Sequence, residues 1–65
     1  MIEELRNAAR KAQSGCDAIE RATVHLVETI GHLENAKHGK SKDAQVIFAE
    51  LRTIQARLDG MLEAL

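Results

Sequence analysis

The chain has 65 residues, a formal net charge of −1 and one cysteine, and 45% of its residues are hydrophobic. This length predicts a single domain, residues 1–65, whose core is small enough that a partner or a cross-link is often needed for stability. Cys16 has no second cysteine to pair with, and no set of cysteines and histidines has the spacing of a structural zinc site. The near-neutral charge excludes a general attraction to nucleic acid or membranes.

The composition predicts an all-α protein that stays off membranes. The chain has no proline and a single aromatic residue, Phe48, and it is rich in alanine, leucine, glutamate and arginine, which are good helix formers. Its start is acidic and then amphipathic, unlike a signal peptide, and no run reaches the ~18–20 apolar residues of a membrane span. One unpaired cysteine without a secretion signal favours the cytoplasm.

A heptad pattern beginning at Ile2 predicts a first helix over about residues 2–37. A third line, made of small residues, runs beside its two apolar lines and predicts that another helix packs closely against it. The two lines, apolar except for Thr23, are Ile2, Ala9, Cys16, Thr23 and Ile30, and Leu5, Ala12, Ile19, Leu26 and Leu33; the small line is Ala8, Gly15, Ala22, Thr29 and Ala36.

A second helix is predicted over about residues 42–64. Ala44, Leu51, Leu58 and Leu65 alternate there with Ile47, Ile54 and Met61, and this alternation defines the expected contact with the first helix.

A turn at residues 38–41 joins the two helices. Gly39 is expected to take the left-handed conformation that ends the first helix, and Ser41 to cap the second. We therefore predict an antiparallel helical hairpin. The alternative is a three-helix bundle with a break at Ser14–Gly15, because Ser14 and Asp17 resemble a capping box and glycine destabilises a helix.

The unequal helix lengths predict association between chains. Pairing the helices across the turn places Leu65 level with Ser14, so residues 2–13 have no partner within the hairpin. Further apolar residues lie beside the seams. We expect a dimer or larger homo-oligomer, a dimer giving a four-helix bundle, and also a protein partner. The expected interface residues are Ile2, Leu5, Val24, Val27, Phe48 and Leu62.

The segment "KHGKSK" ends like a phosphate-binding P-loop, but Glu34 stands where that motif needs its first glycine, and the preceding residues are helical in pattern. A weaker hypothesis remains, because helix N-termini attract anions. If this hypothesis of anion binding holds, the alternative partner is nucleic acid or a small phosphorylated ligand. The candidate anion-binding residues are Lys37, His38, Lys40, Ser41 and Lys42.

Metal binding and catalysis are not expected. His25, Glu28 and His32 share one helix face, but their 3+4 spacing is stretched for a metal, so we interpret them as solvated side chains and expect no metal or cofactor. Cys16 is expected to be a small core residue. No catalytic triad spacing and no core carboxylate pair are present, so we expect no enzyme activity.

These observations predict a small cytoplasmic interaction protein, such as an adaptor, a regulator or an antagonist, with phage or mobile-element origin as one source. It would act through self-association and helix-face contacts. The expected architecture is similar to that of short dimeric hairpin proteins such as the plasmid copy-number regulator Rop, a likeness of architecture that implies no function.

Overall fold

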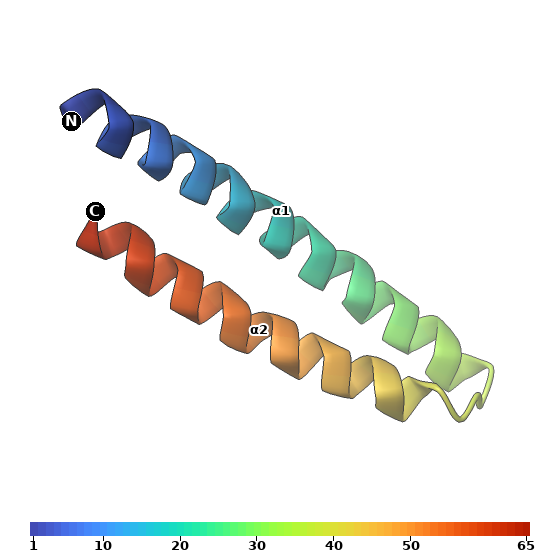
Figure 1. The fold of residues 1–65 in the computed structure, drawn as a ribbon. Coiled ribbons are helices and arrows are strands. Elements are labelled where there is room, and N and C mark those ends of the chain that lie inside the picture. Colours follow the sequence, from blue (N-terminus) through green and yellow to red (C-terminus); the bar gives the residue numbers. More distant parts are fainter.

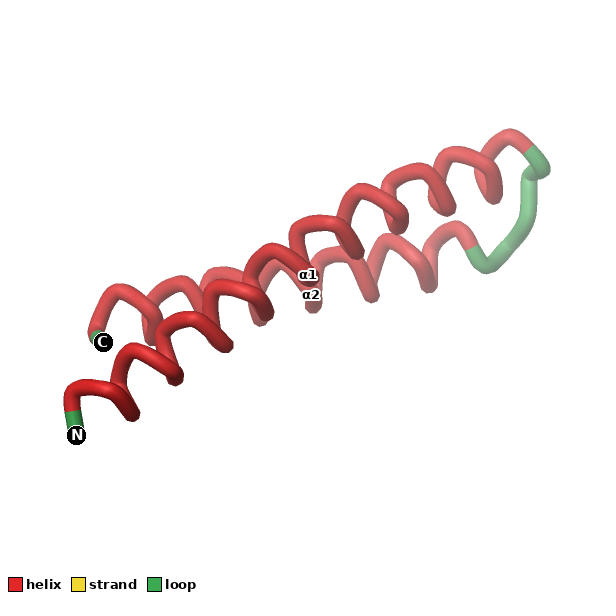
Figure 2. The backbone as a smooth tube through the Cα atoms, turned by 90° about the horizontal axis from the view of Figure 1, so that it is seen from above, coloured by secondary structure: helices red, strands yellow, loops and turns green.

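The computed structural model describes all 65 residues as an antiparallel hairpin of two helices. Helix α1 spans Ile2–Asn35 and helix α2 spans Ser41–Ala64, and they lie side by side (Figure 1). Only the turn and the chain ends are non-helical (Figure 2). The molecule measures 53 × 15 × 11 Å and its radius of gyration is 15.4 Å, against about 11 Å for a compact domain of this length. The hairpin is therefore a rod.

Helix α1 runs through Ser14 and Gly15 without interruption, so the prediction of a continuous first helix is confirmed and the three-helix alternative is wrong. Glycine at this position allows a close approach of α2. A Cβ atom placed on Gly15 would lie 3.3 Å from Cδ2 of Leu58. A close contact between the helices thus lies at the residue that the sequence offered as a possible break.

The end of α1 differs from the prediction. Lys37, and not Gly39, takes the left-handed conformation, with φ of 54°. The amide of Lys37 donates to the carbonyl of Glu34 at 3.0 Å, and the amide of His38 donates to the carbonyl of Leu33 at 2.9 Å. This pair of bonds is a Schellman motif. Because α1 ends at Asn35, two residues earlier than expected, the left-handed position falls on a lysine.

The start of α2 also differs. Ser41 is the first helical residue, Lys40 occupies the cap position, and no side chain caps the helix. The amide of Ser41 instead donates to the carbonyl of His38 at 3.2 Å. Nζ of Lys40 lies 3.1 Å from a carboxylate oxygen of Asp43. The expectation that Ser41 caps α2 is therefore wrong, because the backbone of the turn provides the partner.

The core of the hairpin consists of small side chains. Only Ala12, Cys16, Thr23 and Ala44 are buried, and no large side chain is fully buried. The hydroxyl of Thr23 donates to the carbonyl of Glu20 at 2.6 Å, which satisfies the one buried polar side chain. Farther along the same seam of α1, the larger residues are half-buried, as predicted: Ile19, Leu26, Ile30 and Leu33.

Helix α2 is rotated relative to the predicted seam. Phe48, Gln55 and Leu62 face α1 and are half-buried, as are Leu51 and Leu58. By contrast, three residues that were expected in the contact are 50–53% exposed: Ile47, Ile54 and Met61. We call these three the exposed stripe of α2.

The N-terminal overhang is shorter than the pairing across the turn predicted. Residues 1–8 are exposed, but Ala9 is half-buried and Ala12 is buried. Near the turn, Glu34 bonds to Gln45, while at the far end Gly15 is close to Leu58. The contact between the helices therefore extends farther toward the N-terminus than residue-by-residue pairing counted from the turn implies. Figure 1 shows that the first turns of α1 still extend beyond the end of α2.

Candidate interaction surface

The hairpin exposes far more surface than a compact chain of its mass. Its accessible area is 5205 Å², whereas a compact 7.2 kDa monomer exposes about 4,100 Å². The excess is about 1,100 Å², and a typical stable interface buries about 800 Å² on each partner. Ten large hydrophobic side chains are about half exposed or more. The surface left uncovered in one chain is therefore as large as one side of a protein interface.

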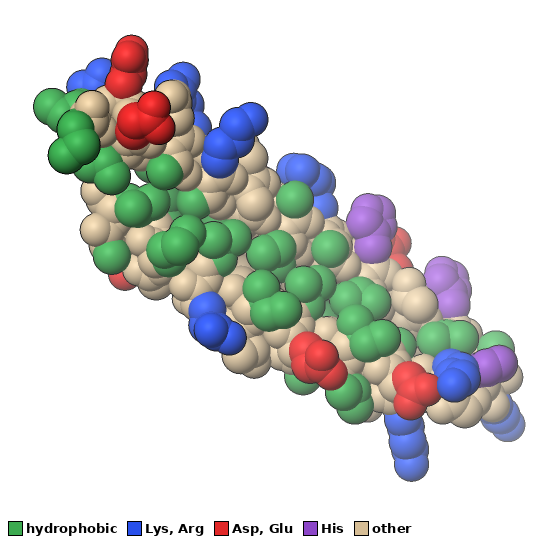
Figure 3. Space-filling view, viewed as in Figure 1, with side chains coloured by type: hydrophobic (Ala, Val, Ile, Leu, Met, Phe, Trp, Pro, Cys, Tyr) green, Lys and Arg blue, Asp and Glu red, His purple; other side chains and the backbone are tan.

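One face of the hairpin carries three of these ten side chains, those of the exposed stripe. Gly15, Ala22 and Thr29 recur every seven residues on α1, and we call them the small-residue line. The contact between Gly15 and Leu58 shows that this line lies on the flank of α1 next to α2. Leu58 is one turn from both Ile54 and Met61, so the exposed stripe borders the same flank. Figure 3 shows hydrophobic side chains gathered along the line between the two helices.

The opposite face of the hairpin carries polar contacts between the helices. Nε2 of Gln45 donates to a carboxylate oxygen of Glu34 at 2.9 Å. Farther along, hydrogen bonding to the Asp59 carboxylate, then burial, then the negative charges of Asp59 and Asp17 raise the pKa of Cys16 from 9.0 to about 11. The thiol stays protonated near neutral pH, so Cys16 is a packing residue and a poor nucleophile.

The residues predicted for the interface occupy three separate places. Val24 and Val27, which we call the outer valines, are more than half exposed on α1, away from the small-residue line. Phe48 and Leu62 are half-buried against α1. Ile2 and Leu5, 70% and 52% exposed, lie on the N-terminal overhang. The structure does not bring these three groups together, and sequence reasoning missed the exposed stripe because it placed those residues inside the hairpin.

The basic turn holds its side chains in different ways. Nδ1 of His38 accepts a hydrogen bond from the amide of Lys40 at 3.1 Å, and the ammonium of Lys40 is paired with Asp43. Lys37 and Lys42 are exposed and form no salt bridge, and Ser41 is half-buried. Anion binding at this turn stays a prediction from the sequence.

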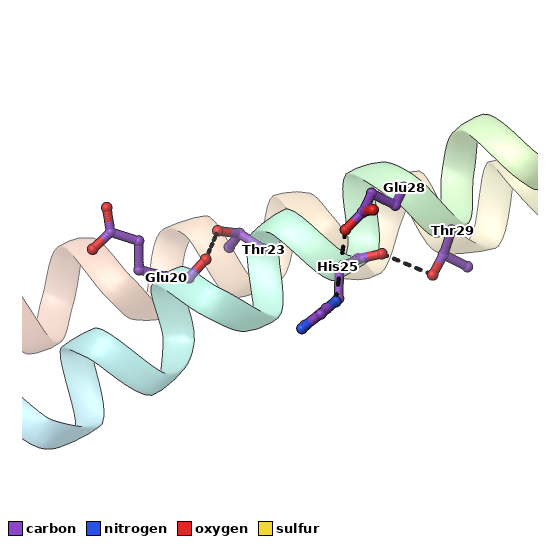
Figure 4. A network of polar contacts seen from close by, with 5 residues as sticks. All are labelled: Glu20, Thr23, His25, Glu28 and Thr29. Carbon is purple, nitrogen blue, oxygen red and sulfur yellow. Dashed lines mark hydrogen bonds and ion pairs between the residues drawn. The ribbon is translucent and has the colours of Figure 1, made fainter.

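The histidine face of α1 is engaged in local contacts. Nδ1 of His25 lies 3.7 Å from a carboxylate oxygen of Glu28, and the hydroxyl of Thr29 donates to the carbonyl of His25 at 2.8 Å (Figure 4). His32 does not join this pair, and the structure holds no cluster of three histidine, cysteine or acidic side chains suited to a metal ion. The structure thus unites only two of the three side chains considered as metal ligands.

Three shallow depressions mark the surface, and each is lined by residues of α1 alone. Two lie along the first half of α1, around Arg10, and one lies near Arg21. None is formed between the helices. Neither helix combines the length and the apolar character required to cross a membrane.

Comparison with known proteins gives no relative from which a function could be transferred, because no protein-family model, curated protein or solved structure matches this chain.

Proposed function

We propose that this chain is a non-enzymatic interaction module that self-associates in the cytoplasm, with a dimeric four-helix bundle as its basic form, and that acts on a protein partner as an adaptor, a regulator or an antagonist. The proposal rests chiefly on the uncovered apolar surface. The total accessible area of 5205 Å² is about 1,100 Å² larger than that of a compact monomer, and ten large hydrophobic side chains are about half exposed or more within it.

The thin core supports the same proposal. A chain of 65 residues gains only a few kcal/mol from a single core, and here the buried residues are three small apolar ones and a threonine. A helix pair of this kind leaves one side of each helix in water. Covering that side with a second copy would add apolar burial at ~25 cal/mol per Å², which favours folding coupled to association.

Thermal unfolding at several protein concentrations tests this proposal. For a folded dimer in equilibrium with unfolded chains, each tenfold increase in concentration adds about 1.4 kcal/mol. With an unfolding entropy of about 2.1 cal/mol/K per residue over two chains, the midpoint should rise by about 5 °C per tenfold increase. Circular dichroism at 222 nm follows the transition. A midpoint that stays constant over a hundredfold range of concentration would contradict the proposal.

A further inference from the structure

The bulky side chains of the exposed stripe and the small side chains of the small-residue line are complementary in size. We propose that a second copy of this chain packs on the face that carries them so that the exposed stripe of α2 in each copy lies on the small-residue line of α1 in the other, about a two-fold axis parallel to the helices. This inference rests on the proposed function and adds to it the face, the symmetry and the residues that meet. The sizes of the side chains and their positions along the rod carry the argument.

Large and small side chains alternate at matching levels. The contacts of Glu34 with Gln45 and of Gly15 with Leu58 fix the relative positions of the two helices. Counting along both helices from these two contacts, the three bulky residues of the stripe stand at the heights of the three small ones, so each projecting side chain meets a residue with room beside it. The level pairs are Met61 with Gly15, Ile54 with Ala22, and Ile47 with Thr29.

The direction of the two-fold axis follows from that size difference. An axis parallel to the helices places α2 of one copy on α1 of the other, so bulky side chains pack on small ones. A perpendicular axis within the interface places α2 on α2 and α1 on α1, which sets bulky side chains against bulky ones and leaves the small ones facing each other. Interiors are close-packed and tolerate voids poorly, so the parallel axis is favoured.

The N-terminal overhang is compatible with this axis. A parallel two-fold axis places the overhangs of both copies at the same end of the bundle, diagonally across from each other, whereas a perpendicular axis places them at opposite ends. Ile2 and Leu5 are exposed in the single hairpin, and the choice of axis rests on the side-chain sizes alone.

Polar side chains border the same face. On α2, Asp43, Glu50 and Arg57 follow the outer side of the exposed stripe at intervals of seven residues, and on α1, His25 and His32 follow the outer side of the small-residue line. With the axis parallel to the helices, Glu50 comes level with His25 of the other copy, and Asp43 with His32. An imidazole N–H can donate a hydrogen bond to a carboxylate, so the rim of this arrangement is polar and compatible with the contact.

Disulfide mapping between different variants tests this arrangement. In a Cys16→Ala background, Ala22→Cys and Ile54→Cys are made as separate chains, mixed in urea, refolded by dilution and oxidised. A disulfide between the two chains is expected in the mixture, and neither variant should cross-link when oxidised alone. The matched control replaces Ala22→Cys with Val24→Cys, on the outer valines, which should not cross-link to Ile54→Cys. A second pair, Thr29→Cys with Ile47→Cys, covers the case in which the first variants fold poorly.

The outcomes separate the two proposals. Cross-linking of both mixed pairs, absent from the control, supports the parallel arrangement. Cross-linking of Ile54→Cys with itself, or cross-linking of the Val24→Cys control, would overturn it in favour of another packing. A dimeric mass without either expected disulfide would overturn this inference and leave self-association intact. A monomeric mass for the unmodified chain would overturn both.

Discussion

Replacing Ile54 by alanine should weaken self-association strongly without disturbing the hairpin. Ile54 is 50% exposed in the single chain, so a second copy would bury about half of a side chain whose full burial is worth about 1.5–3 kcal/mol. The loss is about 1 kcal/mol at each site, and a two-fold dimer has two sites. A total of about 2 kcal/mol corresponds to an increase of about thirtyfold in the dissociation constant. Alanine is the better helix former, so α2 should remain intact.

Val46→Ala is the matched control, because Val46 is 57% exposed but lies away from the stripe on the outer side of α2. Sedimentation equilibrium with interference optics is suitable, since the chain has no tryptophan or tyrosine. The dissociation constant should rise for Ile54→Ala and stay unchanged for Val46→Ala. Equal weakening by both changes, or none by Ile54→Ala, would refute the assignment of this face.

Three further predictions concern stability. Lys37→Gly should raise the free energy of unfolding by about 1 kcal/mol, because glycine takes the φ of 54° found at Lys37 without the steric cost of a side chain. Urea unfolding measures this change, and a loss of stability would contradict the assignment of the Schellman motif. Gly60→Ala should stabilise the chain by about 1 kcal/mol, because a Cβ added at Gly60 meets nothing within 4 Å. Gly15→Ala should stabilise it less, because the added methyl group would lie 3.3 Å from Leu58. Equal gains in the free energy of unfolding would show that α2 does not approach Gly15 closely. The pKa of Cys16 is raised from 9.0 to about 11 in the folded chain, so its protonated thiol contributes fully to the free energy of unfolding below pH 9, and this contribution is lost as the pH rises to 11. Urea unfolding between pH 9 and pH 11 should therefore show a steeper loss of stability for the unmodified chain than for Cys16→Ala. Parallel curves for the two proteins would refute the assignment of a buried Cys16 thiol beside Asp59.

The first helix was predictable because its apolar residues lie on a single side of the helix along most of its length. Its contact residues lie on two lines bordered by small residues on one side and by mostly polar ones on the other, so one rotation buries them best. The same argument explains why Gly15 does not break α1: the pattern keeps its register through this point, and the glycine serves close packing with Leu58.

The second helix was harder because its apolar surface is too wide for one neighbour. Its hydrophobic residues fill three adjacent lines, and the hairpin can cover only two of them. The structure buries the line of Phe48 and Leu62 and leaves the line of Ile47, Ile54 and Met61 exposed. The choice depends on contacts across the helix pair, such as Gln45 with Glu34, which no pattern within α2 reveals.

The turn was predicted in place but not in detail. Its chemistry depends on where α1 ends, and an error of two residues at that end moved the left-handed position from Lys37 to Gly39 and gave Ser41 a capping role. Helix ends are set by the balance of local bonds, here those to the carbonyls of Leu33 and Glu34, and sequence signals locate them only to within a residue or two.

Self-association of the unmodified protein is tested by its molar mass in solution. Sizing chromatography with light scattering and refractive-index detection, repeated over a range of concentrations, should give about twice the chain mass of 7.2 kDa. Ultraviolet spectra recorded on the same peak also test the basic turn, because a chain without tryptophan or tyrosine absorbs little near 260 nm and a bound nucleotide would stand out. We expect a dimer with a featureless spectrum. A stable monomer at every concentration, fully helical and folded, would contradict this expectation.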